Sequence, residues 1–196
     1  MKKRSLIPVA IVVIAVGLVA RTWLQKSAAP LKLEYSTKNA FASKGVAMIP
    51  WRDPTKDIQK IFPGAPIPDT GNPSVVALSR HRLALIKKLG KLDHNALYVH
   101  KITNKGVVLL RRAKGENGAI EVVVFVTQAK KIAGIAIQRH REPDNIAVKL
   151  GAPSFLNAFN GLTAESTFPT FPEKSLQAVS DVIRALLIEY DAGSHA

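Results

Sequence analysis

Four runs rich in β-branched residues, joined by very short links, constrain the fold of this chain more than any other feature. The runs are ALYVHKI (96–102), GVVLLRR (106–112), AIEVVVFVT (119–127) and KIAGIAIQR (131–139), and the links are TNK, AKGENG and QAK. A parallel pair of strands needs a connection of about a dozen residues or more, so links this short require antiparallel neighbours. The sequence therefore predicts a four-stranded meander with the strand through Val122 to Val126 in a central position.

Two helices are predicted before the strands. The first starts at the N-cap Asp53, buries Ile58 and Phe62 on one face, and ends at Gly64. The second is predicted over 72–90, from the pair NP to a glycine. Its polar side carries four cations: Arg80, Arg82, Lys87 and Lys88. This side is interpreted as a solvated face or, alternatively, as a contact surface for anionic lipid headgroups or an acidic partner.

Two further helices are predicted after the strands. The segment APSFLNAFNG (152–161) starts with a proline and carries its apolar side chains on one face. The last helix, from 174 to about 190, has apolar residues at i, i+3, i+4, i+7, i+8 and i+11, the strongest amphipathic pattern in the chain. Residues 140–151 show no regular period. Helices before and after the strands are expected to cover one face of the sheet, so the domain at 53–191 is predicted to be α+β.

The N-terminus is typical of a membrane anchor. A basic tip, Lys2 to Arg4, precedes fifteen uncharged residues from Leu6 to Ala20, and 1–25 is long enough to span a bilayer when Arg21 snorkels to the interface. The basic tip favours a cytoplasmic end. We therefore predict a single transmembrane helix in the inner membrane, with the soluble domain on the periplasmic side.

Two alternatives to this topology stay open. One is a cleaved signal peptide, although a cut after Ala20 puts Leu18 at the third position before it, where a small residue is wanted. A cut after Ala28 puts Lys26 at the same position. The other alternative is a cytoplasmic soluble domain, because basic residues also flank the far end of the span.

An irregular segment at 26–52, which we call the strap, connects the anchor to the first helix. It has no sustained period, yet a free linker rarely carries so many large apolar residues, among them Phe41, Met48 and Trp51. The strap is therefore predicted to pack on its own domain or to dock on a neighbouring subunit.

No constellation for catalysis stands out in the sequence. It has no P-loop, dinucleotide fingerprint, HExxH or GxSxG motif, and no cysteine for disulfides or thiolate metal sites. The five histidines are spread along the chain without ligand spacing, so structural or surface roles are predicted for them. The 28 Lys and Arg residues against 14 Asp and Glu favour anionic partners. We predict a protein that is not an enzyme, and no nucleic-acid partner for a domain outside the cytoplasm.

Five pieces of sequence occur in an order that carries a family resemblance. They are IQKIFPGA (58–65), the helix ending at KKLGK, the strands closing with KIAGIAIQRHREP, FLNAFNG (155–161) and SLQAVSDVIRALLIEY (175–190). In this order they resemble the FMN-binding domain family, whose members include the anchored flavoprotein subunits of the Rnf and Nqr electron-transport complexes. The resemblance covers about residues 55–190 and implies an FMN-binding-domain-like fold.

The turn after the last strand departs from the family pattern. In the family a strand like I.GI.I..H.ET leads into PGLG, a glycine-rich turn that lies against the flavin and its phosphate. This chain keeps His140 and Glu142 but has Asp144 where the flexible turn is expected. A carboxylate there would repel a phosphate dianion, and the loss of glycine removes close backbone approach. If flavin is retained, the resemblance places His140, Arg141 and Glu142 beside the isoalloxazine or the phosphate.

A second departure precedes the last helix. The family carries a motif like SGATxTS there, whose final threonine can hold FMN through a phosphoester at the helix N-terminus. This chain has PTFPEKS at 169–175, which puts Lys174 at the acceptor position, and lysine cannot form that link. Thr170 and Ser175 carry hydroxyls, so a shifted register stays open. In a noncovalent flavin site, Lys174 would supply charge for the phosphate.

Two functions are compatible with these departures. The first is a noncatalytic structural or assembly subunit of a membrane-bound redox or photosynthetic electron-transfer complex, without a cofactor. In this function the strap and the basic helix dock on an integral membrane protein complex. The alternative is a membrane-anchored electron-transfer flavoprotein that binds FMN noncovalently.

Overall fold

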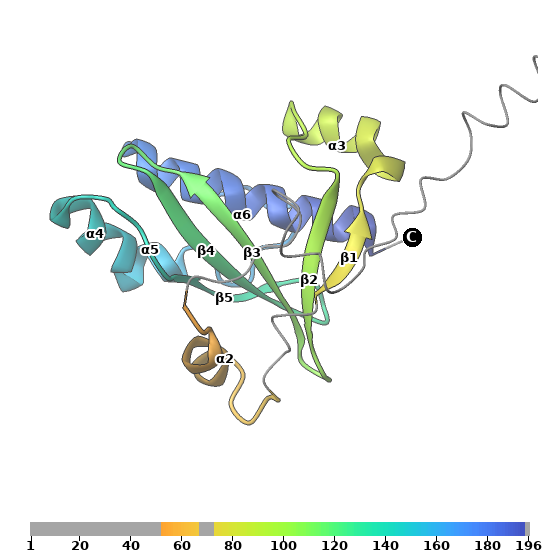
Figure 1. Ribbon diagram of the computed structural model, residues 1–196, viewed down its shortest axis with the longest axis horizontal. Helices are drawn as coiled ribbons and strands as arrows, with labels where there is room; N and C mark the ends of the chain where they lie inside the picture. The colour runs from red at the N-terminus through yellow and green to blue at the C-terminus, as the bar shows by residue number, and fades with distance from the viewer. Residues whose placement is uncertain (1–51, 67–72, 195–196) are drawn as a thin grey trace, which may run out of the picture. The chain divides into compact units, whose positions relative to one another are not determined.

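The computed structural model describes residues 52–66 and 73–194 of the chain. These residues form a five-stranded antiparallel sheet with helices packed against it, which confirms the predicted α+β class (Figure 1). No helix within these two ranges is long and apolar enough to cross a membrane. Several predictions fall outside the described residues, namely those for the anchor at 1–25 and for Phe41, Met48 and Trp51 of the strap.

The strands lie in the sheet in the order in which they occur in the chain, and each pairs antiparallel with the next. They are β1 (Ser74–Ala77), β2 (Ala96–Ile102), β3 (Gly106–Lys114), β4 (Ala119–Thr127) and β5 (Ile132–Ile137). The four predicted strands are confirmed as β2 to β5. β4 is interior, between β3 and β5, but β3 is the middle strand because a fifth strand adds beyond β2.

The second predicted helix is wrong in its first half, where the chain forms the edge strand β1. Val75 of β1 lies opposite Tyr98 of β2. The chain becomes helical only afterwards, in the 3-10 turn η1 (Ser79–His81) and in α3 (Arg82–Leu89). The NP pair often starts a helix. Here the two β-branched residues of SVVA favour a strand, and pairing with β2 gives that strand backbone hydrogen bonds, so the strand is the more stable structure.

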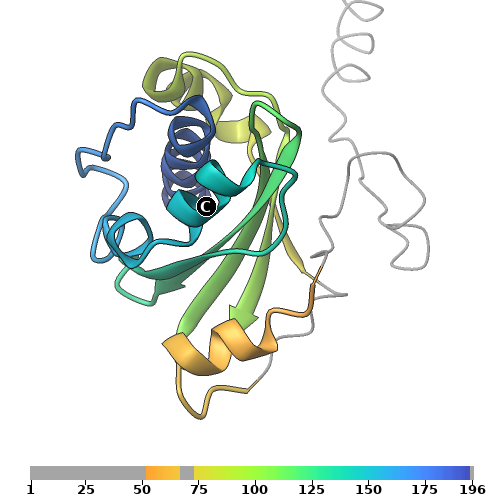
Figure 2. The same cartoon turned by 90° about the vertical axis from the view of Figure 1, so that its left-hand side faces the viewer.

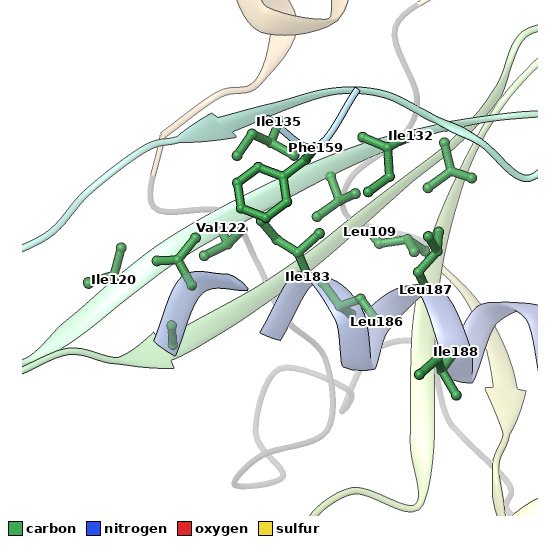
Figure 3. Close-up of a cluster of buried hydrophobic side chains, with 14 of the residues drawn as sticks. Leu109, Ile120, Val122, Ile132, Ile135, Phe159, Ile183, Leu186, Leu187 and Ile188 are labelled. Atoms are coloured by element: carbon green, nitrogen blue, oxygen red, sulfur yellow. The ribbon is translucent and has the colours of Figure 1, made fainter. Parts of the chain in front are cut away.

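Helices cover both faces of the sheet, whereas the sequence predicted cover on one face only (Figure 2). On the first face α6 (Lys174–Gly193) lies along β3. Ile183 and Leu186 of this helix pack in one buried cluster with Leu109 and Val122 of the sheet (Figure 3). The predicted amphipathic face of the last helix is thereby confirmed.

The second face is covered by α2 (Thr55–Ile61). Ile58 is fully buried there, and the Phe62 ring meets Phe125 of β4 edge-on, with the ring centroids 6.4 Å apart. The helix begins one residue later than predicted, so Pro54 and not Asp53 is its N-cap, and the Asp53 carboxylate accepts hydrogen bonds from the backbone and the hydroxyl of Thr55. Burial on both sides explains why β4 and the first half of β3 are almost continuously apolar rather than alternating.

Residues 140–151 are more regular than the sequence indicated, because most of them form α4 (Asp144–Gly151). The carbonyl oxygen of Pro143 accepts the first helical hydrogen bonds, and Ile146 and Leu150 bury one side of the helix. The short helix α5 (Pro153–Asn157) follows directly. The burial of this i, i+4 apolar pair against the rest of the domain stabilises the segment as a helix.

A buried ion pair connects β3 to α6. The Arg111 guanidinium donates two hydrogen bonds to the Glu189 carboxylate, at 3.0 and 2.6 Å, and the two side chains are 13% and 3% exposed. Loss of either partner would leave the other charge buried without compensation. This pair therefore helps to fix how α6 lies on the sheet.

Candidate functional site

Three segments that are distant in sequence meet at one end of the sheet. They are the β3–β4 loop at 115–118, the turn at 138–142 after β5, and the first turn of α6. The turn is held beside β4 by two backbone hydrogen bonds of Glu121. Its N–H donates to the Arg139 carbonyl, and its carbonyl accepts the Gln138 N–H. The structure thus brings the predicted site residues His140, Arg141, Glu142 and Lys174 into one region.

Glu142 is the centre of this region. Its side chain is 7% exposed, and its carboxylate accepts hydrogen bonds at 3.1 Å from both the backbone and the side-chain amide of Asn117. The Ser175 hydroxyl at the start of α6 lies beside this carboxylate and helps to lower its pKa. In turn, Ser175 Oγ accepts the Glu116 N–H at 3.0 Å. We call this set the Glu142 latch, because it joins the hairpin loop, the turn and α6.

The charge of Glu142 is stabilised by the latch. Burial alone would raise the pKa of this carboxyl, but the hydrogen bonds from Asn117 and Ser175 outweigh it, and the pKa lies below its ordinary value. Glu142 therefore stays ionised near neutral pH. Its oxygens are already engaged by groups of the chain itself.

Gly115 makes room for the latch. A side-chain carbon at this position would collide with Oε1 of Glu142 and with Ile120. Only glycine therefore allows the loop to approach the carboxylate this closely. The sequence offers no reason to connect Gly115 and Asn117 of the AKGENG link with Glu142, because no local pattern joins them, and it indicates Ser175 only as a hydroxyl near the acceptor position.

A hollow of about 280 Å³ opens beside the latch. It is lined by Gly118, Ala119, Arg139, His140 and Arg141. His140 is oriented by its neighbour, since its Nδ1 lies 3.3 Å from the N–H of Glu142. Arg139 and Arg141 are exposed, so the hollow presents positive charge to solvent.

Lys174 does not line this hollow. Its side chain is 84% exposed, and its ammonium lies 3.5 Å from the Glu116 carboxylate. The residue before it, Glu173, forms an ion pair with Lys149 of α4. Carboxylates of the chain itself, Glu142 and Glu173, thus lie at the start of α6, where the helix dipole favours negative charge.

The described residues do not fit FMN. The hollow is smaller than the roughly 300–1,000 Å³ of pockets that bury drug-sized ligands, and its lining of Gly118, Ala119, His140 and two arginines offers no large apolar side chain to an isoalloxazine ring. The start of α6, which would receive the phosphate, already has the Glu142 carboxylate beside it. A group of three or more His, Asp or Glu residues able to hold a metal ion is also absent from the described part of the chain.

The predicted docking residues of the basic helix are all on the surface. Arg80 lies in η1, and Arg82, Lys87 and Lys88 lie in α3. Lys88 forms an ion pair with Glu165 at 2.7 Å, and Arg82 donates to the Asn95 side chain at 3.2 Å. The four cations therefore lie together on the exposed side of η1 and α3, which follow the edge strand β1.

Comparison with known proteins gives no family assignment. Neither a protein-family model nor a curated protein matches this chain. The resemblance to the FMN-binding domain family accordingly stands on the order of sequence pieces described above.

Proposed function

We propose that this chain is a noncatalytic structural or assembly subunit of a membrane-bound redox or photosynthetic electron-transfer complex. Its domain would be FMN-binding-like, and the residues at the position of the flavin site would stabilise the fold instead of binding a cofactor. The observation that carries the proposal is the Glu142 latch, in which the β3–β4 loop is held to the Glu142 carboxylate through Asn117 and to the start of α6 through Ser175. Groups that would face a flavin and its phosphate are thereby used to hold the fold together.

The membrane part of the proposal is supported by the sequence. The uncharged run within 1–25 and its basic tip favour a single-pass anchor in the inner membrane with a periplasmic domain. The apolar residues of the strap supply a contact surface for an integral membrane protein complex.

A second candidate function is electron transfer with noncovalently bound FMN. The observation in its favour is the positively charged hollow lined by Arg139, His140 and Arg141, which suits a phosphate group. In that case these residues would bind the phosphate, and the redox chemistry would belong to the flavin. The poor fit for the isoalloxazine makes this the weaker candidate.

The visible absorption spectrum of the detergent-purified full-length protein separates the two functions. It is recorded before and after acid precipitation, together with the intact mass. A colourless protein of unmodified mass is the result expected for the structural subunit. A flavin spectrum that moves to the supernatant would favour the second candidate, and one that stays with the pellet would place a covalent link in a shifted register at Thr170 or Ser175.

Titration with free FMN sharpens the test, with flavin fluorescence as the readout. We expect no saturable quenching by the wild-type chain. Saturable quenching that is lost in Arg139→Gln/Arg141→Gln, but kept in the matched control Lys105→Gln/Lys131→Gln, would support the flavoprotein. The control removes two exposed cations from turns at the other end of the sheet.

A further inference from the structure

Leu83 on α3 is the most exposed large apolar side chain within 52–66 and 73–194, with 85% of its surface open to solvent. A single exposed leucine is ordinary on a protein surface. The unusual feature is its surroundings, because Arg80 lies three residues before it and Lys87 four residues after it, and both are exposed. The outward face of η1 and α3 therefore carries one leucine among cations.

Most of the positive charge around Leu83 is not neutralised. Five cations occur on or beside α3, namely Arg80, Arg82, Lys87, Lys88 and Lys91. Ion pairs occupy two of them, Lys88 with Glu165 at 2.7 Å and Lys91 with Asp93 at 2.9 Å. No carboxylate of the described ranges lies within 4.0 Å of the other three. We call Arg80, Arg82, Leu83 and Lys87 the α3 surface.

The composition of the α3 surface suits a lipid bilayer better than a protein. The centres of protein interfaces are enriched in aromatic residues and depleted in lysine, and their anchors insert into pockets. The α3 surface has no aromatic residue. Arginine, lysine and leucine together are typical of helices that lie on anionic membranes, where the long side chains reach headgroups while the apolar residue enters the interface.

We propose that the α3 surface binds anionic phospholipid headgroups, with Leu83 inserted at the membrane interface. Each Lys or Arg near an anionic membrane raises binding about fivefold, so three cations give about a hundredfold preference for anionic over neutral bilayers. The attraction should weaken with salt, because exposed charges are screened. The proposal does not depend on the scaffold function, since it rests only on the exposed residues of one helix.

A fluorophore at position 83 tests the proposal in the full-length protein. The chain has no cysteine, so Leu83→Cys gives a single site for an environment-sensitive NBD label. The labelled protein is incorporated into vesicles of phosphatidylcholine, with or without phosphatidylglycerol. We expect a blue shift and a gain in intensity only with phosphatidylglycerol, and the reversal of both at high salt.

Two matched controls separate this surface from general attraction. Val148 on α4 is 73% exposed, so the same label at Val148→Cys should give equal spectra in both vesicles. In the Leu83→Cys protein, Arg80→Glu/Lys87→Glu should abolish the anionic response. Lys105→Glu/Lys131→Glu makes the same change in net charge at exposed positions in the β2–β3 and β4–β5 turns, and it should keep the response.

Three results would overturn the proposal. One is a label at position 83 that gives the same spectrum in both kinds of vesicle. Another is an equal response from the two double charge variants, which would mean that net charge alone attracts the protein. The third is a shift that appears only when a solubilised partner complex is added, because the surface would then bind an acidic protein. Circular dichroism confirms that each variant is folded.

Discussion

Truncation of Glu142 should destabilise the domain by an amount that the latch allows us to calculate. Glu142→Ala removes the carboxylate that lies beside the fully buried hydroxyl of Ser175, at a cost of about 1–3 kcal/mol. The bonds from Asn117 contribute less, about 1 kcal/mol together, because Asn117 is exposed and water can replace the carboxylate. We expect a total loss of about 3 kcal/mol in the free energy of unfolding, or about 6–12 °C in Tm for a domain of this size.

Urea unfolding followed by circular dichroism measures this loss. Glu142→Gln keeps the shape and one acceptor oxygen, so it should cost about half as much as the alanine variant. Glu116→Ala is the matched control, because it removes a neighbouring carboxylate whose ion pair with Lys174 is on the surface and should matter by less than about 0.5 kcal/mol. Hydrogen exchange adds a local readout, since the Asn117 amide should exchange faster in Glu142→Ala.

The pH dependence of the same variants checks the sign of the electrostatic contribution. The pKa of Glu142 is lowered in the folded protein from its ordinary value of 4.5, so its charge stabilises the fold above that pH. The stability advantage of the wild type over Glu142→Gln should therefore be complete at pH 7. It should shrink as the pH falls below about 4.5 and the folded carboxyl takes up its proton.

Two outcomes would refute this interpretation of Glu142. The first is a stability of Glu142→Ala within about 0.5 kcal/mol of the wild type, which is typical of a surface substitution. The second is an advantage over Glu142→Gln that grows as the solution is acidified, because the folded pKa would then be raised rather than lowered.

Three further predictions concern the rest of the chain. Arg111→Ala should cost about 3–5 kcal/mol in urea unfolding by leaving Glu189 charged and buried, and Arg111→Met/Glu189→Leu should recover most of it. Gly106→Ala should cost about 1–3 kcal/mol in thermal unfolding, because φ is +151° there and the new carbon meets a carbonyl of β4. The control Gly151→Ala should be neutral or stabilising, because there is open space around that position. Trp51→Ser in the strap should release the protein from its complex on a native gel with no change in Tm, and retention or unfolding would contradict docking by the strap.

Strands β2 to β5 and helix α6 could be predicted because their signals are local and repeated. β4 consists of nine residues that are almost all apolar, and α6 carries its apolar period over about three turns. Short links then left antiparallel pairing as the only arrangement. In these elements the periodicity of the sequence and the packing in the fold favour the same structure.

The other elements depend on contacts that no local pattern reveals. β1 has four residues, too few for a period, and it is a strand only because β2 lies beside it. The segment of α4 was expected to be irregular because residues 140–151 show no regular period. The latch joins Asn117 to Glu142, which are 25 residues apart, so the sequence could indicate Glu142 as a site residue but not its structural partner.

The order of the strands determines when, during synthesis, the sheet can be completed. Every strand pairs with the one made just before it, so each hairpin can close while the following segment is still in the ribosome. The side of the sheet that packs on α6 is covered later than the strands pair, because residues 174–193 are translated long after β3 and β4. Until then a nascent chain carries a nearly finished sheet with one uncovered apolar side, which is the form that chaperones bind and that aggregates most readily.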